Sequence, residues 1–153
     1  MSGEETVDTG NGVQPTGSFW IISVLALLWN LLGLMAFFGQ VAVMNSEEAL
    51  NQLPEAEREL YKNLPNWVMV CFGIAVVCGV LGCVLLLMRN KLALPVFGLS
   101  LLGVIGQQIH NYFLSNTVDV MGTGAIAFPM IVLVIAIALM FFAKSKTSIG
   151  ILK

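Results

Sequence analysis

The chain has few charged residues, and long parts of its sequence have none. Asp, Glu, Lys and Arg together make up 10% of the 153 residues, whereas a soluble domain carries about 25%. A surface helix of a soluble protein needs a polar face, and these uncharged stretches do not supply one. The composition therefore excludes an ordinary water-soluble domain and indicates a membrane protein.

Four apolar stretches without any Asp, Glu, Lys or Arg account for over half of the chain. They cover about residues 19–43, 67–88, 92–114 and 125–143. The hydrocarbon core of a bilayer is about 30 Å thick, and a helix needs about 20 residues to cross it. Because backbone polar groups there must bond within the protein, each stretch is predicted to be a helix. The expected fold is all-α, an integral membrane four-helix bundle.

Basic residues are scarce in the first connection between these helices and in the N-terminal segment. The first connection holds only Arg58 and Lys62. The remaining basic residues lie in the second connection and at the C-terminal end, and they are Arg89, Lys91, Lys144, Lys146 and Lys153. Since Lys and Arg beside a membrane favour the cytoplasmic side, both termini are predicted to be cytoplasmic, and residues 144–153 are expected to form a cytoplasmic tail.

The N-terminal residues 1–17 contain no Lys or Arg, which argues against a cleaved signal peptide. Their Gly, Thr, Asn and acidic residues cannot bury a core, so a disordered cytoplasmic tail is expected. The first connection has more structure. Ser46 followed by two acids is typical of a helix start, and Pro65 ends the apolar periodicity of this segment. An amphipathic helix is therefore predicted over about residues 46–63, in the first outer loop.

Three roles are open for this predicted outer helix, whose polar face is mainly acidic. It is a plain connector with a buried stripe, a lid over a binding site, or a docking surface for another protein. Glu55 and Glu59 are the candidate partner-binding residues for the docking role. An acidic face is poorly suited to anionic lipid, because interfacial helices usually carry basic residues there.

The chain also lacks the residue groups that common catalytic and metal sites require. It has one His and three Cys, with no CxxC pair, so neither a redox motif nor a zinc site is indicated. The predicted spans hold no carboxylate to assist His110 in acid–base chemistry. No enzyme activity, cofactor or metal site is expected. The absence of a basic patch likewise argues against nucleic-acid binding.

A few polar residues inside the predicted spans are the candidate ligand-binding residues. Gln107, His110 and Asn111 are spaced i, i+3 and i+4, which places them on one helical face. Gln40 in the first span reaches about the same height, and Asn30 lies near the middle of that span. Polar residues within a membrane usually face the bundle interior. Two interpretations stay open, namely an outward-facing polar pocket and hydrogen bonds that join the helices.

The chain also resembles a family of small bacterial four-helix membrane proteins, many of which are labelled sugar transporters. The resemblance covers roughly residues 19–114. It rests on Leu27-Leu28-Trp29-Asn30, Gly33, Ala56-Glu57, Leu60-Tyr61, Pro65, Trp67, Gly79, Gly82, Arg89, Lys91, Ala93, Pro95, Phe97, Ser100-Leu101 and Gln107. It implies a multi-pass protein of the bacterial inner membrane and a role in solute traffic.

Two functions from different classes follow from these observations. The first is a small-solute, sugar-like carrier or binding subunit with an outward-facing polar pocket. Because four helices make a narrow bundle, a carrier is expected to be a homo-oligomer surrounded by membrane lipids. The second is a non-transporting accessory or scaffold subunit of a larger membrane complex, which docks through the acidic outer helix.

Overall fold

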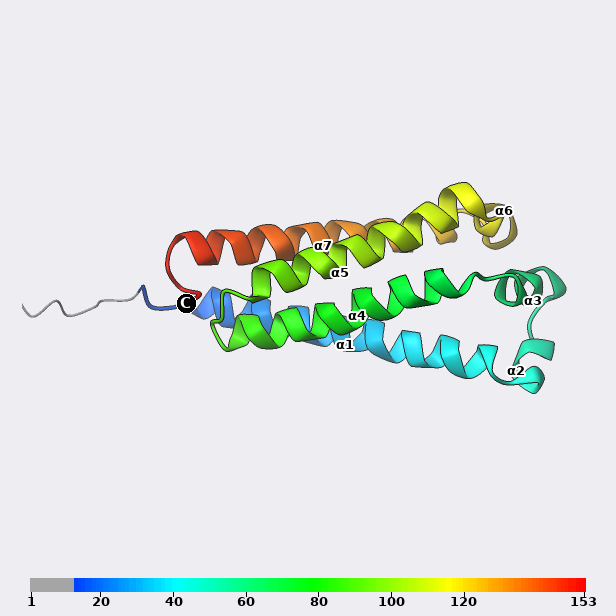
Figure 1. Cartoon of the computed structure of the whole chain (residues 1–153), viewed down its shortest axis with the longest axis horizontal. Helices are drawn as coiled ribbons and strands as arrows, with labels where there is room; N and C mark the ends of the chain where they lie inside the picture. The colour runs from blue at the N-terminus through cyan, green and yellow to red at the C-terminus, as the bar shows by residue number, and fades with distance from the viewer. Residues whose placement is uncertain (1–12) are drawn as a thin grey trace, which may run out of the picture.

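The structure, a computed structural model, describes residues 13–153 and contains a bundle of four long helices (Figure 1). They are α1 (Gly17–Met44), α4 (Asn66–Leu87), α5 (Ala93–Ile109) and α7 (Gly124–Ser148). Successive long helices run in opposite directions, so α1 begins at the end of the bundle where the chain ends. All four are long and apolar enough to cross a membrane, α5 together with the turn that follows it. The predicted all-α, four-helix membrane bundle is confirmed, and the protein is a multi-pass membrane protein.

Short helices gather at the opposite end of the bundle, which we call the α3 end (Figure 1). They are α2 (Glu47–Asn51), α3 (Glu55–Lys62), the π-helical turn η1 (His110–Leu114) and α6 (Thr117–Met121). The helix expected over 46–63 is thus divided into α2 and α3. Ser46 caps α2 as its sequence predicts, because its Oγ accepts a hydrogen bond of 3.2 Å from the backbone N–H of Ala49. Pro54 causes the division, since proline disfavours a helical residue before it.

The most extensively packed helix pair is α4 with α5. Gly103 makes this approach possible, because a Cβ atom there would lie 2.6 Å from the carbonyl oxygen of Cys71 and 2.8 Å from the nitrogen of Ala75. Small residues serve this purpose in membranes, where association depends on close contact. The Ser100 hydroxyl also donates a hydrogen bond of 2.6 Å to the carbonyl of Ala75. These two helices therefore form a tightly joined wall.

The bundle closes on its other side through aromatic side chains of α1 and α7. The rings of Phe19 and Phe142 stack with their centroids 6.0 Å apart, near the end where the chain terminates. Trp29 and Phe128 bridge the same two helices further along, at 6.3 Å. Long side chains rather than glycines span this side, so α1 and α7 leave space between them that α4 and α5 do not.

The C-terminal residues are packed, which differs from the tail expected over 144–153. α7 continues to Ser148, because the sequence has no Pro or Gly between Pro129 and Gly150. Gly150 has a φ of 76°, a conformation that glycine adopts readily, and the chain reverses there. Ile151 and Leu152 then turn into the core, with 2% and 4% of their surfaces exposed.

This C-terminal hook, residues 149–153, is also fastened to the turn between α4 and α5. The backbone N–H of Lys153 donates to the carbonyl of Arg89 at 2.8 Å, and that of Lys91 donates to the carbonyl of Lys153 at 3.1 Å. The Nε–H of Arg89 donates to the carbonyl of Ile151 at 3.2 Å. Of the expected N-terminal tail, residues 1–12 lie outside the described residues, and α1 begins at Gly17.

Candidate functional site

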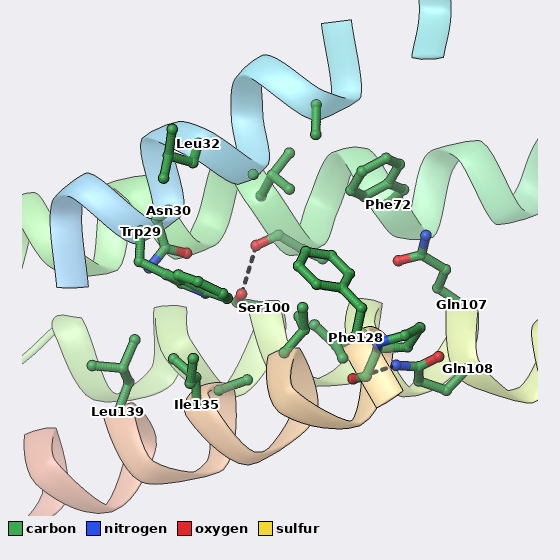
Figure 2. Close-up of a pocket in the computed structure, with 18 of the residues that line it drawn as sticks. Trp29, Asn30, Leu32, Phe72, Ser100, Gln107, Gln108, Phe128, Ile135 and Leu139 are labelled. Atoms are coloured by element: carbon green, nitrogen blue, oxygen red, sulfur yellow. Dashed lines mark hydrogen bonds between the residues drawn. The ribbon is translucent and has the colours of Figure 1, made fainter. Parts of the chain in front are cut away.

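All four long helices enclose an apolar space, which we call the main cavity (Figure 2). Its volume is about 280 Å³. Most of its lining is aliphatic or aromatic, including Trp29 of α1, Phe72 of α4 and Phe128 of α7. The space exists because aromatic pairs rather than small residues close the bundle between α1 and α7. Its size and lining are those of a site for a small apolar group.

Apart from Asn30 and Ser100, the polar side chains of the main cavity lie toward the α3 end. Gln107, Gln108 and Asn111 project there from α5 and its continuation η1 (Figure 2 shows both glutamines). The Nε2 of Gln108 donates a hydrogen bond of 2.7 Å to the carbonyl of Pro129 in α7. Its Oε1 is buried and has no hydrogen-bond partner among the described residues. This amide end therefore presents unused hydrogen-bonding capacity beside an apolar chamber.

A second cavity, which we call the vestibule, adjoins the amide end and has a volume of about 160 Å³. Gln107 and Asn111 line both cavities and so lie at the boundary between them. The vestibule is more polar and is covered by the short helices of the α3 end. Its remaining lining consists of Gln40, Leu60, Tyr61, Leu64, Val68, Thr117 and Met121. Leu60 and Tyr61 belong to α3, which places that helix over the vestibule, where the lid role would require it.

Three of the predicted ligand-binding residues come together, since Gln40, Gln107 and Asn111 all line the vestibule. Asn30 lines the main cavity, but its amide nitrogen is already used. Its Nδ2 donates to the carbonyl of Ala26 at 2.9 Å and approaches the Sγ of Cys83 at 3.5 Å. These contacts of Asn30 therefore fit hydrogen bonding within the bundle better than ligand binding.

His110 does not share the surface of Gln107 and Asn111, and it lines neither cavity. Its ring lies edge-on to the ring of Trp67 in α4, with 5.7 Å between the centroids. Its Nδ1 is buried without a hydrogen-bond partner among the described residues. His110 and Asn111 are consecutive and therefore point about 100° apart around the helix axis. His110 consequently faces Trp67 of α4, whereas Asn111 faces the cavities.

Gln108 and Ser100 are the residues that the sequence reasoning did not select. Gln108 lies off the i, i+3, i+4 face, and only the position of α7 shows that its amide reaches the carbonyl of Pro129. The outer acids Glu55 and Glu59 are exposed on α3 and line neither cavity. Within residues 13–153, no charged side chain lines either cavity, and no group of His, Cys, Asp and Glu could hold a metal ion.

Comparisons of the chain with protein-family models, curated proteins and solved structures found no match.

Proposed function

We propose that this protein is a membrane-embedded binding subunit or carrier for a small amphiphilic molecule. One observation supports this function above the others: an apolar cavity inside the bundle ends in three amide side chains and adjoins a more polar vestibule. An apolar body of the ligand fits the main cavity, and its polar group fits the amide end. The pocket is thus apolar over most of its length and polar at one end, rather than polar throughout.

The lining favours an amphiphile over the free sugar that the family label implies. Each hydroxyl of a buried sugar needs a hydrogen-bond partner, and an unpartnered one costs about 1–3 kcal/mol. Asn30 and Ser100 also line the main cavity, but their N–H and O–H groups already donate to backbone carbonyls. The other partners lie at the end with Gln107, Gln108 and Asn111. Elsewhere the sugar would face aliphatic and aromatic side chains. A molecule with one polar end matches this distribution.

We further propose that the protein lies in a bacterial inner membrane, with the α3 end outward and both termini cytoplasmic. The basic residues of the second connection and of the C-terminal end lie together at one end of the bundle, as a cytoplasmic face requires. A ligand would then reach the vestibule from the outer side. If the protein carries its ligand across the membrane, a homo-oligomer is expected, because one copy makes a narrow bundle.

This orientation predicts which engineered cysteine reacts with a membrane-impermeant maleimide in intact cells. Glu59→Cys, exposed on α3, should label without permeabilisation. Ser148→Cys lies at the exposed last residue of α7 and should label only after the membrane is permeabilised. The unsubstituted protein corrects for labelling of Cys71, Cys78 and Cys83 in α4. The reverse pattern would show that the proposed orientation is inverted.

Binding itself is tested by native mass spectrometry of the protein in lipid nanodiscs. A reproducible small-molecule adduct is expected. Gln107→Leu should raise the dissociation constant roughly fivefold and so lower the occupancy of the adduct, because one neutral hydrogen bond contributes about 1 kcal/mol. Gln52→Leu is the matched control, since Gln52 is an exposed amide outside both cavities. Equal occupancy in both variants, or no adduct at all, would count against a site at the amide end.

The second candidate function is an accessory subunit that docks on a larger complex through α3. Its supporting observation is that Glu55 and Glu59 are exposed on this helix and take no part in either cavity. Reversing both charges to Lys should then remove a stoichiometric partner from the purified particle, while Gln107→Leu leaves it in place. A partner retained after charge reversal would exclude docking through these acids.

A further inference from the structure

We infer that the ligand is a neutral lipid with a hydroxyl-bearing head, of the monoacylglycerol or diacylglycerol class. The inference rests on the proposed function and specifies its ligand. The head would lie at the amide end and extend into the vestibule, and the acyl chain would occupy the main cavity. Four properties of the two cavities lead to this chemistry.

The first property is charge. Among residues 13–153, no Asp, Glu, Lys, Arg or His side chain lines either cavity. A charged head buried there would lose its hydration without gaining an opposite charge, which is costly. Fatty acids, phospholipids and cationic amphiphiles are therefore poor ligands, whereas a neutral head carries no such cost.

The second property is the need for a hydrogen-bond donor. Gln108 is 8% exposed, and its Oε1 has no partner among the described residues. An amide oxygen only accepts hydrogen bonds, so the complementary group must donate one. The Gln107 and Asn111 side chains make no hydrogen bond within the described residues and offer further N–H donors. A hydroxyl group satisfies both requirements, because it donates and accepts. A ketone, ester or quinone head alone would leave Oε1 unpaired.

The third property is the exit for an acyl chain. Leu32 of α1 and Phe128 of α7 line the main cavity, yet the side chain of each is 62% exposed. The cavity therefore opens between α1 and α7, toward the lipid (Figure 2 labels both residues). A cavity of about 150 Å³ accommodates a benzene-sized molecule. The main cavity can thus take a segment of chain, and the remainder would pass through this opening into the bilayer.

The fourth property is the vestibule beyond the amides. It adds the polar side chains of Gln40, Tyr61 and Thr117 to those of Gln107 and Asn111. A head with a single hydroxyl would stop at Gln108 and leave this space unused. Glycerol places a second oxygen close to the first, so that it can reach the vestibule. This favours a glycerol head over that of a simple long-chain alcohol.

Trp29 provides a direct probe of the main cavity, because bromine quenches tryptophan fluorescence on contact. The chain has three tryptophans, and Trp20 and Trp67 line neither cavity. A variant with Trp20→Phe and Trp67→Phe retains Trp29 alone. A variant with Trp29→Phe and Trp67→Phe retains Trp20, which is 42% exposed and reports only partitioning of the probe into the bilayer. Both are studied as full-length protein in nanodiscs.

Each variant is titrated with four probes that share one ω-bromoundecyl-type chain. Their heads are a monoglyceride, a carboxylate, a trimethylammonium group and no polar head. The monoglyceride should quench Trp29 saturably, at a concentration more than roughly a hundredfold below that of the charged probes. Gln108→Leu should raise the half-quenching concentration of the monoglyceride roughly tenfold. It should not weaken quenching by the headless probe, which also shows that the variant is folded.

The outcomes separate this inference from the proposed function. If the charged probes quench Trp29 as well as the monoglyceride does, the site binds amphiphiles but the neutral class is wrong. If the headless probe matches the monoglyceride, or Gln108→Leu changes nothing, the hydroxyl assignment is wrong. If no probe quenches Trp29 beyond the Trp20 control, the proposed binding function itself is overturned.

Discussion

Replacing Ile151 with alanine should lower the free energy of unfolding by about 2–5 kcal/mol, the cost of truncating a buried isoleucine. Ile151 is 2% exposed and belongs to the same hydrophobic cluster as Phe19, Leu86 and Phe97. Because its backbone is held by the hydrogen bond from Arg89, the surrounding residues have little freedom to fill the space. Denaturant unfolding in a fixed detergent measures the change.

Ile149→Ala is the matched control for this experiment. Ile149 is the same residue type, two positions earlier in the same hook, and 46% exposed. Its truncation should change the free energy of unfolding by no more than about 0.5 kcal/mol. Similar losses in the two variants would contradict the packed arrangement of residues 149–153. Removing residues 151–153 should be at least as destabilising as Ile151→Ala, since it also deletes the hydrogen bonds to Arg89 and Lys91.

The long helices could be predicted because the bilayer imposes a simple rule on composition. Each apolar stretch had to be long enough to cross and had to contain no unpaired charge. The capped start of α2 could also be predicted from the sequence, because Ser46 and the acids after it act within one helical turn. Both features depend on residues that are neighbours in the sequence. Local chemistry was therefore sufficient for the elements and for the class of fold.

The C-terminal hook could not be predicted, because its stability comes from distant residues. The segment was expected to be a tail because it is short and follows Lys144 and Lys146, although three of residues 149–153 are apolar. Ile151 and Leu152 are buried because they pack into the cluster that contains Phe19 and Leu86, and the turn between α4 and α5 holds the chain end there through backbone hydrogen bonds. Nothing within the segment itself indicates that partnership.

The candidate site was predictable in part, for a similar reason. Gln107 and Asn111 lie on one face in either helix geometry that α5 and η1 adopt, and both line the two cavities. His110 fails the same argument because it lies about 100° from Asn111 around the helix axis, on the side of Trp67. The role of Gln108 depends on where Pro129 of α7 lies, and the cavity depends on the separation of α1 from α7. Such distances between helices are not encoded in the spacing within one helix.

Replacing Gly103 with alanine should lower the free energy of unfolding by about 1–3 kcal/mol, the usual cost of inserting a methyl group into a tightly packed contact. The new Cβ would lie 2.6 Å from the carbonyl oxygen of Cys71 and 2.8 Å from the nitrogen of Ala75. Both are backbone atoms of α4, so no side-chain rotation can relieve the overlap. The two helices must separate, which also lengthens the hydrogen bond of 2.6 Å from Ser100 to Ala75.

Gly98→Ala is the control, because it lies in the same helix and a Cβ there has no atom within 4 Å. Alanine favours a helix over glycine, so this variant should be unchanged or slightly more stable. The free energies of unfolding of both variants are compared in the same detergent. Equal values would mean that α4 and α5 are further apart than the distance of 2.6 Å from a Cβ at position 103 to the Cys71 oxygen implies. A loss confined to Gly103→Ala would identify the α4–α5 pair as the rigid wall of the bundle. The opening for a ligand would then belong to the side between α1 and α7, where aromatic rings rather than backbones make the contact.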